Sequence, residues 1–208
     1  KINIKWVDAC EVNSENVNTI FENTNGILIP GGFGERGIEG KIETAKFART
    51  HNIPYFGICL GMHIAIIEFG RHVINLSDAN GIEFNEKTPY PVISLLPEQE
   101  KIHKKGGTMR LGTYPCKVMD GSKLKTIYKK DVITERHRHR YEFNSTYQEQ
   151  YEKHGVVFSG TSPDQSLVEV MELPTHKWFI ACQYHPEFKS RPNQSHPLFE
   201  SFIEATIN

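Results

Sequence analysis

The chain has 208 residues and a formal net charge of −1 at pH 7. This length is enough for one sizeable hydrophobic core and is short for two ordinary domains. The near-neutral charge gives no bulk attraction to nucleic acid or to a membrane surface, and no apolar stretch approaches the roughly 20 residues of a membrane span. We therefore expect neither nucleic acid nor a membrane among the partners.

The cysteines are few and scattered. There are four, Cys10, Cys59, Cys116 and Cys182, and none belongs to a CxxC pair. This spacing argues against a zinc site and against a dense disulfide framework. It fits a reducing compartment, so we expect a cytoplasmic protein with no bound metal.

The first residues predict a strand and a helix. Residues 2–6 alternate apolar and polar side chains, as in a half-buried strand, and residues 8–22 predict a short amphipathic helix. The start has neither the apolar segment nor the cleavage site of a signal peptide. It reads as a strand already under way, which suggests a piece of a longer protein.

A second apolar strand, residues 26–29, ends in the glycine-rich loop 30–37, and a helix is expected over 38–50. This order is typical of α/β proteins. The loop allows three interpretations. It is a plain turn, a phosphate cradle for which the usual glycine spacings are absent, or a source of backbone N–H groups for an oxyanion.

Cys59 stands on a predicted sharp turn between the apolar strand 55–58 and an apolar helical pattern. Gly57 and Gly61 flank it, and such a turn needs backbone angles and close packing that side chains obstruct. Serine hydrolases build their nucleophile elbow in this way, and a helix N-terminus favours a thiolate. The alternative is a buried structural cysteine.

The rest of the chain predicts further strands and two helices. The glycine loop and Cys59 would lie at the carboxyl ends of parallel strands, where ligands bind in such sheets. We therefore predict an α/β fold with a mostly parallel central sheet flanked by helices. Strands are expected over 91–96, 132–143, 156–158, 167–173 and 178–184, a charged mobile segment over 97–107, and helices over 145–154 and 197–207.

The segment 132–143 carries a basic run. In a strand, Arg136, Arg138 and Arg140 would share one face, and the intervening histidines the other. The run is a solvated basic face, an anion site or a nucleic-acid patch. Five basic residues in a neutral chain make a poor nucleic-acid footprint.

His185 and Glu187 form a candidate base and its partner. His185 ends an apolar strand, and residues two apart in an extended stretch project to the same side. Glu187 would thus accept a hydrogen bond from the imidazole and fix its tautomer. With a cysteine nucleophile upstream, the pattern predicts a Cys-His-Glu triad.

Three motifs together resemble the signature of the class I, triad-type glutamine amidotransferases: Gly31-Gly32, the GICLG around Cys59, and His185-Pro186-Glu187. Longer strings are similar to the glutaminase domain of the CTP synthase family, namely PGGFGERGIEGK, FGICLGMHIAIIEF, GGTMRLG, ERHRHRYEFN and ACQYHPEF. The resemblance implies one glutaminase domain over residues 1–208. It also implies that the family's first strand and helix, and a preceding amidoligase domain, are missing from this sequence.

The resemblance implies glutamine hydrolysis. Cys59 attacks the side-chain amide, and His185, held by Glu187, protonates the departing ammonia and then activates water against the glutamyl thioester. Backbone N–H groups of Gly32 and Leu60 would form the oxyanion hole. The implied glutamine-binding residues are Gly32, Leu60, Gly61, Met62, His63, Glu83 for the α-amino group, and Arg140 and Tyr141 for the α-carboxylate side.

The resemblance also implies partners. Ammonia would pass to the synthetase domain of the same protein, a homotetramer in the family, which aminates UTP to CTP with ATP and Mg. This domain would need no cofactor of its own, and GTP would act as an allosteric activator. The residues expected to respond to GTP are Phe33, Gly34, Arg36, Gly37, Met109, Arg110, Leu111 and Gly112.

Two departures from the family stand out. His63 replaces the usual Gln, one helical turn from Cys59, where it would perturb the thiolate or the glutamine contacts, or would use only its backbone. The missing first strand should leave an exposed sheet edge. These departures keep open a regulatory or binding module of the same fold. A γ-glutamyl hydrolase is a third reading, against which the RHRHRYE and GGTMRLG strings argue.

Overall fold

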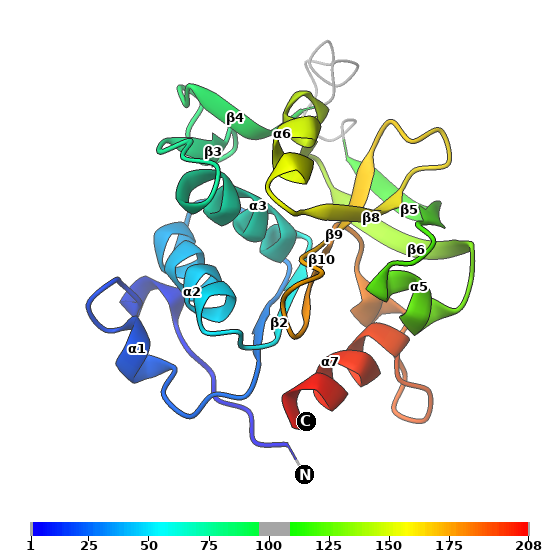
Figure 1. Ribbon diagram of the computed structural model, residues 1–208, viewed down its shortest axis with the longest axis horizontal. Helices are drawn as coiled ribbons and strands as arrows, with labels where there is room; N and C mark the ends of the chain where they lie inside the picture. Colours follow the sequence, from blue (N-terminus) through cyan, green and yellow to red (C-terminus); the bar gives the residue numbers. More distant parts are fainter. Residues whose placement is uncertain (1, 96–108, 208) are drawn as a thin grey trace.

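The computed structural model describes residues 2–95 and 109–207, arranged around one seven-stranded and one three-stranded sheet (Figure 1). The strands are β1 (Ile27–Ile29), β2 (Tyr55–Ile58), β3 (Ala79–Gly81), β4 (Tyr90–Ser94), β5 (Arg110–Val118), β6 (Val132–His139), β7 (Glu142–Phe143), β8 (Val157–Thr161), β9 (Val168–Glu172) and β10 (Phe179–Cys182). The helices are α1 (Val17–Ile20), α2 (Ile38–Thr50), α3 (Leu60–His72), α5 (Lys123–Tyr128), α6 (Gln148–Lys153) and α7 (Pro197–Ile207), with 3-10 turns η1 (Ala9–Glu11), η3 (Ser145–Tyr147) and η4 (Pro186–Phe188).

The large sheet has the order β1-β2-β10-β9-β8-β5-β6. β2 pairs in parallel with β1 on one side and with β10 on the other, and the pairings beyond β10 are antiparallel. The predicted parallel arrangement therefore holds around β2, the strand that leads to Cys59. The small sheet has the order β3-β4-β7.

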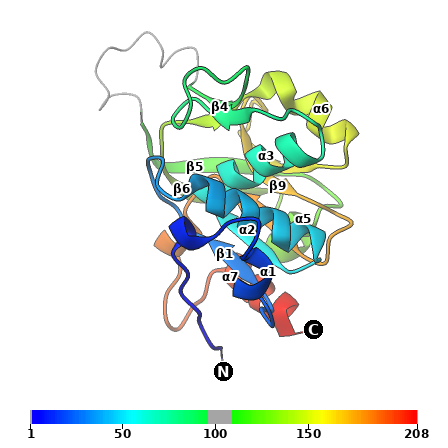
Figure 2. The ribbon, with the colours of Figure 1, turned by 90° about the vertical axis from the view of Figure 1, so that its left-hand side faces the viewer.

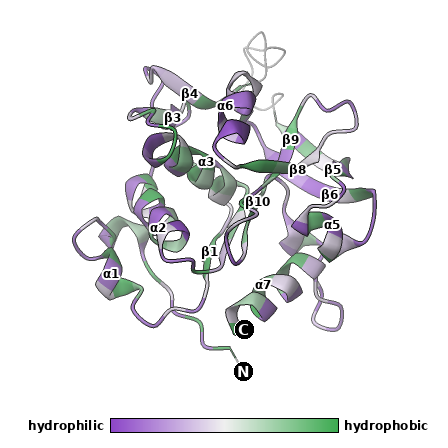
Figure 3. Ribbon diagram, viewed as in Figure 1, coloured by the Kyte–Doolittle hydropathy of each residue, from purple (hydrophilic) through white to green (hydrophobic). Residues whose placement is uncertain are grey.

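Helices cover both faces of the large sheet, as predicted for an α/β fold. Figures 1 and 2 show α2 and α3 side by side on one face and α7 on the other. The strand residues alternate accordingly, because successive side chains point to opposite faces. Tyr55 and Phe179 pack in the core cluster under α2 and α3, whereas Phe56 and Ile180 pack in the cluster with α5 and α7. Figure 3 shows hydrophobic residues along β1 and β8 and a hydrophilic outer surface on α6.

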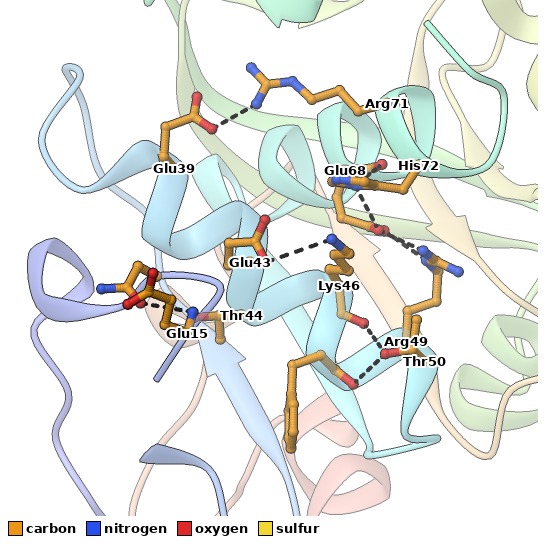
Figure 4. Close-up of polar contacts among 12 residues, drawn as sticks. Glu15, Glu39, Glu43, Thr44, Lys46, Arg49, Thr50, Glu68, Arg71 and His72 are labelled. Carbon is orange, nitrogen blue, oxygen red and sulfur yellow. Dashed lines mark hydrogen bonds and ion pairs between the residues drawn. The ribbon is translucent and has the colours of Figure 1, made fainter. Parts of the chain in front are cut away.

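Helix α3 is buried along its length and is held by charges (Figure 4). Its Glu68 is fully buried, and both oxygens accept hydrogen bonds from Arg49 of α2 at 2.7 and 2.8 Å. Burial opposes ionisation of Glu68, but the bonds from Arg49 and His72 outweigh it and lower the pKa of the carboxyl. Arg71 pairs with Glu39 at 2.7 Å. The helix that begins after Cys59 is therefore fixed in position.

Several predicted elements are confirmed within a few residues, and two early ones are wrong. Residues 2–7 form no strand, and the side chain of Trp6 is 89% exposed. Alternation makes a strand only where a neighbour completes the hydrogen bonds. The expected helix over 8–22 is reduced to η1 and α1. β1 ends the strand order of the large sheet, so its outer edge is unpaired within the described ranges.

Other differences lie in the middle of the chain. Helix α5 was not anticipated; the side chain of Ser122 caps it by accepting a hydrogen bond from the Lys125 N–H. The charged segment 97–107 lies outside the described residues. None of the helices in the described ranges is both long and apolar enough to cross a membrane.

Candidate active site

Cys59 lies on a strained turn at the carboxyl end of β2. Its backbone has φ 51° and ψ −100°, in a region that residues other than glycine rarely adopt. The next turn of α3 packs so closely that a Cβ on Gly61 would lie 2.2 Å from the Ile29 carbonyl oxygen. The Cys59 N–H donates to the Cys182 carbonyl at 2.7 Å. The predicted nucleophile elbow is therefore present in the backbone.

The thiol of Cys59 is buried and protonated at rest. It is 2% exposed, and burial raises its pKa to about 12. A hydrogen bond from the Leu60 backbone lowers this pKa, and the carboxylates of Glu187, Glu83 and Glu142 raise it. The thiol must therefore give its proton to a nearby base before it can attack.

His185 is the candidate for this base. Its Nδ1 lies 2.6 Å from Oε1 of Glu187, and its ring stacks on Phe188 with 4.8 Å between centroids. The Nε2 atom is buried and has no hydrogen-bond partner among the described residues. The backbone N–H donates to the Arg136 carbonyl at 2.8 Å. The ring is thus oriented at one nitrogen and free at the other.

Gly31 brings the two reactive side chains together. A Cβ built on it would lie 2.8 Å from Cε1 of His185 and 3.6 Å from Cβ of Cys59. Both residues follow neighbouring parallel strands, since β2 pairs with β10. The cysteine and the histidine therefore close around a position that only glycine can occupy.

The candidate oxyanion-hole residues are also neighbours. A Cβ on Gly32 would lie 3.1 Å from Cδ2 of Leu60. Leu60 is the first residue of α3, so its N–H is one of the groups that the helix itself leaves unbonded. The glycine loop and the helix start meet beside the thiol, which the sequence could not establish.

The candidate glutamine-binding residues from distant segments lie close together. Oε1 of Glu83 accepts a hydrogen bond from the Gly34 N–H at 2.9 Å. The Tyr141 hydroxyl bonds to Arg140, and its pKa is raised by burial and by the charge of Glu83. Glu83 also raises the pKa of Cys59. A carboxylate and a guanidinium thus both act on Tyr141, and the charge of the carboxylate also reaches the thiol, an arrangement that suits a zwitterionic substrate.

His63 is buried among side chains. Only 3% of it is exposed, and its Nε2 lies 2.9 Å from Oε1 of Gln183. Burial lowers its pKa to about 4, against hydrogen bonds of the ring to the Gln183 side chain and the Tyr141 backbone, which raise it. Gly61 and Met62 are buried in the same first turn of α3. Sequence reasoning missed Gln183, although its place two residues before His185 was a usable signal.

The residues expected to respond to GTP lie in two glycine-rich segments, the loop 33–37 and the segment 109–112. The second segment was predicted as a loop, but from Arg110 onward it forms the start of β5. In the first, Phe33 is 58% exposed and Arg36 forms an exposed ion pair with Asp8 at 2.8 Å, next to the left-handed Gly37. In the second, Leu111 is 64% exposed. Met109 is half-buried there, and Gly112 has φ 117°.

Arg110 is the first residue of β5, and its side chain is largely buried. Its Nη2 lies 2.6 Å from Glu169, and its Nη1 lies 3.6 Å from Glu142. Burial and the charge of Glu169 raise the pKa of Glu142 to about 8, against the opposing effect of Arg110, which lowers it. Sequence reasoning did not anticipate this buried ionic group.

The basic run on β6 alternates as predicted. Arg136 and Arg138 are exposed, and His137 and His139 are buried, with Nδ1 of the first 2.8 Å from Nε2 of the second. Burial and the charges of Arg110 and His185 lower the pKa of His137 to about 3. No three His, Cys, Asp or Glu side chains in the described segments are grouped to hold a metal ion.

Comparison with known proteins agrees with this geometry. The family model of the class I glutamine amidotransferases matches residues 1–205. The chain belongs to this family of glutamine-hydrolysing enzymes.

Within the family, the chain is similar to CTP synthases. It is 56% identical over 207 residues to the CTP synthase of Staphylococcus saprophyticus and 57% identical over 204 residues to that of Pelotomaculum thermopropionicum. These alignments cover 100% and 98% of this chain but only 39% and 38% of the relatives, so the chain spans about two fifths of their length.

A solved structure gives the same assignment. The glutaminase domain of Trypanosoma brucei CTP synthase, with bound acivicin, superposes with a TM-score of 0.93 at 38% identity. The match covers 100% of this chain and 81% of that one. The class I glutamine amidotransferase fold is thus confirmed.

Proposed function

We propose that the chain hydrolyses L-glutamine to glutamate and ammonia through the triad Cys59, His185 and Glu187. The observation that carries this proposal is the closure of Cys59 and His185 around Gly31, with Glu187 holding the other nitrogen of the imidazole. A buried thiol, a free ring nitrogen and an oriented tautomer are the parts that cysteine nucleophiles require.

The first step forms the thioester. His185 takes the proton of Cys59, and the sulfur attacks the carbon of the side-chain amide. The negative charge moves to the amide oxygen, where the N–H groups of Gly32 and Leu60 stabilise it; one such donor typically contributes about 2.7–4 kcal/mol. The C–N bond then breaks, and the imidazolium gives its proton to the departing nitrogen.

The second step releases glutamate. His185 takes a proton from water, the hydroxide attacks the thioester carbon, and the C–S bond breaks. The proton returns from the imidazolium to the sulfur of Cys59. Glu187 stays ionised and fixes the ring throughout.

In these steps the substrate zwitterion needs one carboxylate and one cation. Glu83 would take the α-amino group in exchange for the Gly34 N–H that it now accepts. Arg140, with Tyr141 beside it, would face the α-carboxylate.

The test is labelling by a glutamine-mimicking diazo ketone, followed by peptide mapping. Label confined to Cys59 and blocked by excess glutamine supports the proposal. A Cys10→Ser variant, which alters an exposed cysteine, should label equally, and Cys59→Ala should not. Absence of label on Cys59, while a general thiol reagent still reaches it, would instead favour a binding or regulatory module of this fold.

We further propose that the ammonia serves the amination of UTP to CTP by a synthetase domain of the same protein, which would use ATP and Mg. The similarity to CTP synthases supports this role. In the full-length protein, Cys59→Ala should abolish CTP formation from glutamine and preserve it from ammonium salts. Loss of CTP formation with both nitrogen sources would contradict the proposal that this chain only supplies ammonia and that the synthetase domain carries out the amination.

Activation by GTP, a homotetramer and a cytoplasmic location complete the proposal. The exposed apolar side chains of Phe33 and Leu111 support a role for the two glycine-rich segments in the response to GTP. A Phe33→Ser variant should keep glutamine hydrolysis without GTP and lose most of the stimulation by GTP. Full stimulation in this variant would exclude the first loop.

A further inference from the structure

Gln183 carries a fully buried side-chain amide that the steps above do not use. Its Nε2 points at the sulfur of Cys59 from 3.8 Å, and its Oε1 lies 2.9 Å from Nε2 of His63. The Gln183 backbone N–H donates to the Glu169 carbonyl at 2.8 Å, which fixes the strand end. The three side chains form one continuous chain of contacts that ends on the nucleophile.

The topology explains why this amide meets the sulfur. In the parallel pairing of β2 with β10, Cys182 lies opposite Ile58, so the next residues, Gln183 and Cys59, are neighbours. Gln183 also precedes His185 by two residues, in the short bend that follows β10. The strand that delivers the base therefore delivers an amide as well.

His63 determines which end of the amide faces the sulfur. It is one helical turn from Cys59, and burial keeps it neutral by lowering its pKa to about 4. Nε2 of His63 faces the amide oxygen of Gln183, and the Tyr141 backbone is the second hydrogen-bond partner of the ring. A neutral imidazole carries one N–H, so the orientation of Gln183 described here requires that proton on Nε2. With its oxygen held in this way, the amide of Gln183 presents its nitrogen to Cys59.

We propose that the Gln183 amide is a catalytic hydrogen-bond donor to the sulfur of Cys59, and that His63 is the positioning residue that orients it. This inference rests on the proposed function, in which Cys59 is the nucleophile. A donor to a thiolate stabilises the charged form and lowers the pKa of the thiol.

The electrostatic surroundings give the donor its importance. The charges of Glu187 and Glu83 raise the pKa of the Cys59 thiol, as does Glu142 once it ionises near its own pKa of about 8, and His185 is the base that can become the cation beside the thiolate. Leu60 offers one backbone N–H to the sulfur, but the same N–H is needed at the oxyanion once the amide is attacked. Gln183 can stay on the sulfur through attack and through release of the thiolate.

The test is the pH dependence of iodoacetamide alkylation, read at Cys59 by peptide mapping, with the exposed Cys10 as internal reference. Gln183→Met keeps the length of the side chain and removes the donor. Because burial raises the pKa of Cys59 to about 12, its apparent midpoint is obtained from alkylation rates at pH 7 to 9, which are proportional to the thiolate fraction there. This apparent midpoint should move up by about one pH unit, seen as an alkylation rate about tenfold lower at each pH. The kcat for glutamine hydrolysis should fall about tenfold with little change in KM.

Changes at His63 test the positioning role. His63→Gln retains an amide that can hold Gln183, so the alkylation midpoint should stay near that of the unaltered protein. His63→Leu removes the partner and should shift the midpoint in the same direction as Gln183→Met. A purely structural role of His63 would lower stability without moving the midpoint.

The double variant Gln183→Met with His63→Leu keeps the test independent of folding. Removing both partners of the buried Gln183–His63 hydrogen bond leaves neither of these two groups unsatisfied, and only the Tyr141 backbone loses its contact with His63, so the fold should be retained, which thermal denaturation checks. It should still show the raised midpoint. An unshifted midpoint, in a protein whose Cys59 is labelled by the diazo ketone and protected by glutamine, would overturn the role of Gln183 alone. Absence of protected labelling in the unaltered protein would instead contradict the proposed function.

Discussion

Arg110 and Glu169 meet inside the protein at 2.6 Å, although they lie on strands that are not neighbours in the sheet. Glu169 is fully buried, and the side chain of Arg110 is only 10% exposed. The pair ties the start of β5 to β9, whose residue 169 also receives the backbone N–H of Gln183. The start of β5 is therefore connected, through one buried charge pair, to the segment after β10 that contains Gln183.

Removal of the arginine should destabilise the fold strongly. Arg110→Met leaves Glu142 and Glu169 buried without their cation, and breaking such a pair typically costs about 3–5 kcal/mol. Urea denaturation at pH 7 measures this loss. Adding Glu169→Gln to the same variant removes one stranded charge and should recover part of it. Equal stability of Arg110→Met and the unaltered protein would show that the pair contributes nothing.

Glu142 should make stability depend on pH. Burial raises its pKa from 4.5 to about 8, so the folded state holds a proton that the unfolded state has released. Its contribution is present below pH 4.5 and is lost as the pH rises to about 8. The difference in unfolding free energy between the unaltered protein and Glu142→Gln should therefore fall across this window. A difference that stays constant from pH 4.5 to 8 would contradict the raised pKa.

Loss of the carboxylate in the triad should slow the chemistry and spare binding. Glu187→Gln keeps the shape of the side chain but removes the charge that orients and stabilises the imidazolium of His185. The kcat for glutamine should drop about 100-fold with a similar KM, measured as ammonia release. A kcat that is unchanged would remove Glu187 from the triad. Because Glu187 is exposed, the melting temperature should change little.

Gly31 should tolerate no methyl group without loss of activity. In Gly31→Ala, the new Cβ would lie 2.8 Å from the His185 ring, so the base must move away from Cys59. We expect at least a tenfold loss of kcat with a folded protein. Gly121→Ala is the matched control, since it costs about 1 kcal/mol through its φ of 75° in open space and lies outside the site. Full activity of Gly31→Ala would mean that the two side chains need not close around this position.

The sequence allowed prediction of those features that depend on neighbouring residues. Cys59, His185 and Glu187 were identifiable because a strand end, a sharp turn and a spacing of two leave local patterns, and the structure brings the cysteine and the histidine together. The extended backbone expected from His185 to Glu187 is wrong, because Glu187 lies in the 3-10 turn η4, which still brings its carboxylate to Nδ1 of the imidazole. The inward and outward faces of β6 followed from its period of two.

Features that depend on distant partners were not predictable. Arg110 appears in a glycine-rich string that reads as a surface loop, and only the fold places two buried carboxylates against it. The contact between Gln183 and Cys59 depends on the register in which β10 pairs with β2, which no local pattern in the sequence shows. The strand predicted from the alternation at residues 2–6 is absent, because no neighbouring strand pairs with these residues within the described segments.

The parallel pairing of β2 with β10 also governs when the chemistry can start. The first strand of that pair precedes Cys59, and the second, near the end of the chain, precedes His185. Until the late strand docks, the thiol has no base, no Gln183 and no strained turn locked by the Cys182 carbonyl. In the proposed mechanism, a chain still emerging from the ribosome, or one cut before residue 179, would hold a cysteine without its base and would not consume glutamine. Docking of β10 beside β2 would then be the step that joins the nucleophile to His185.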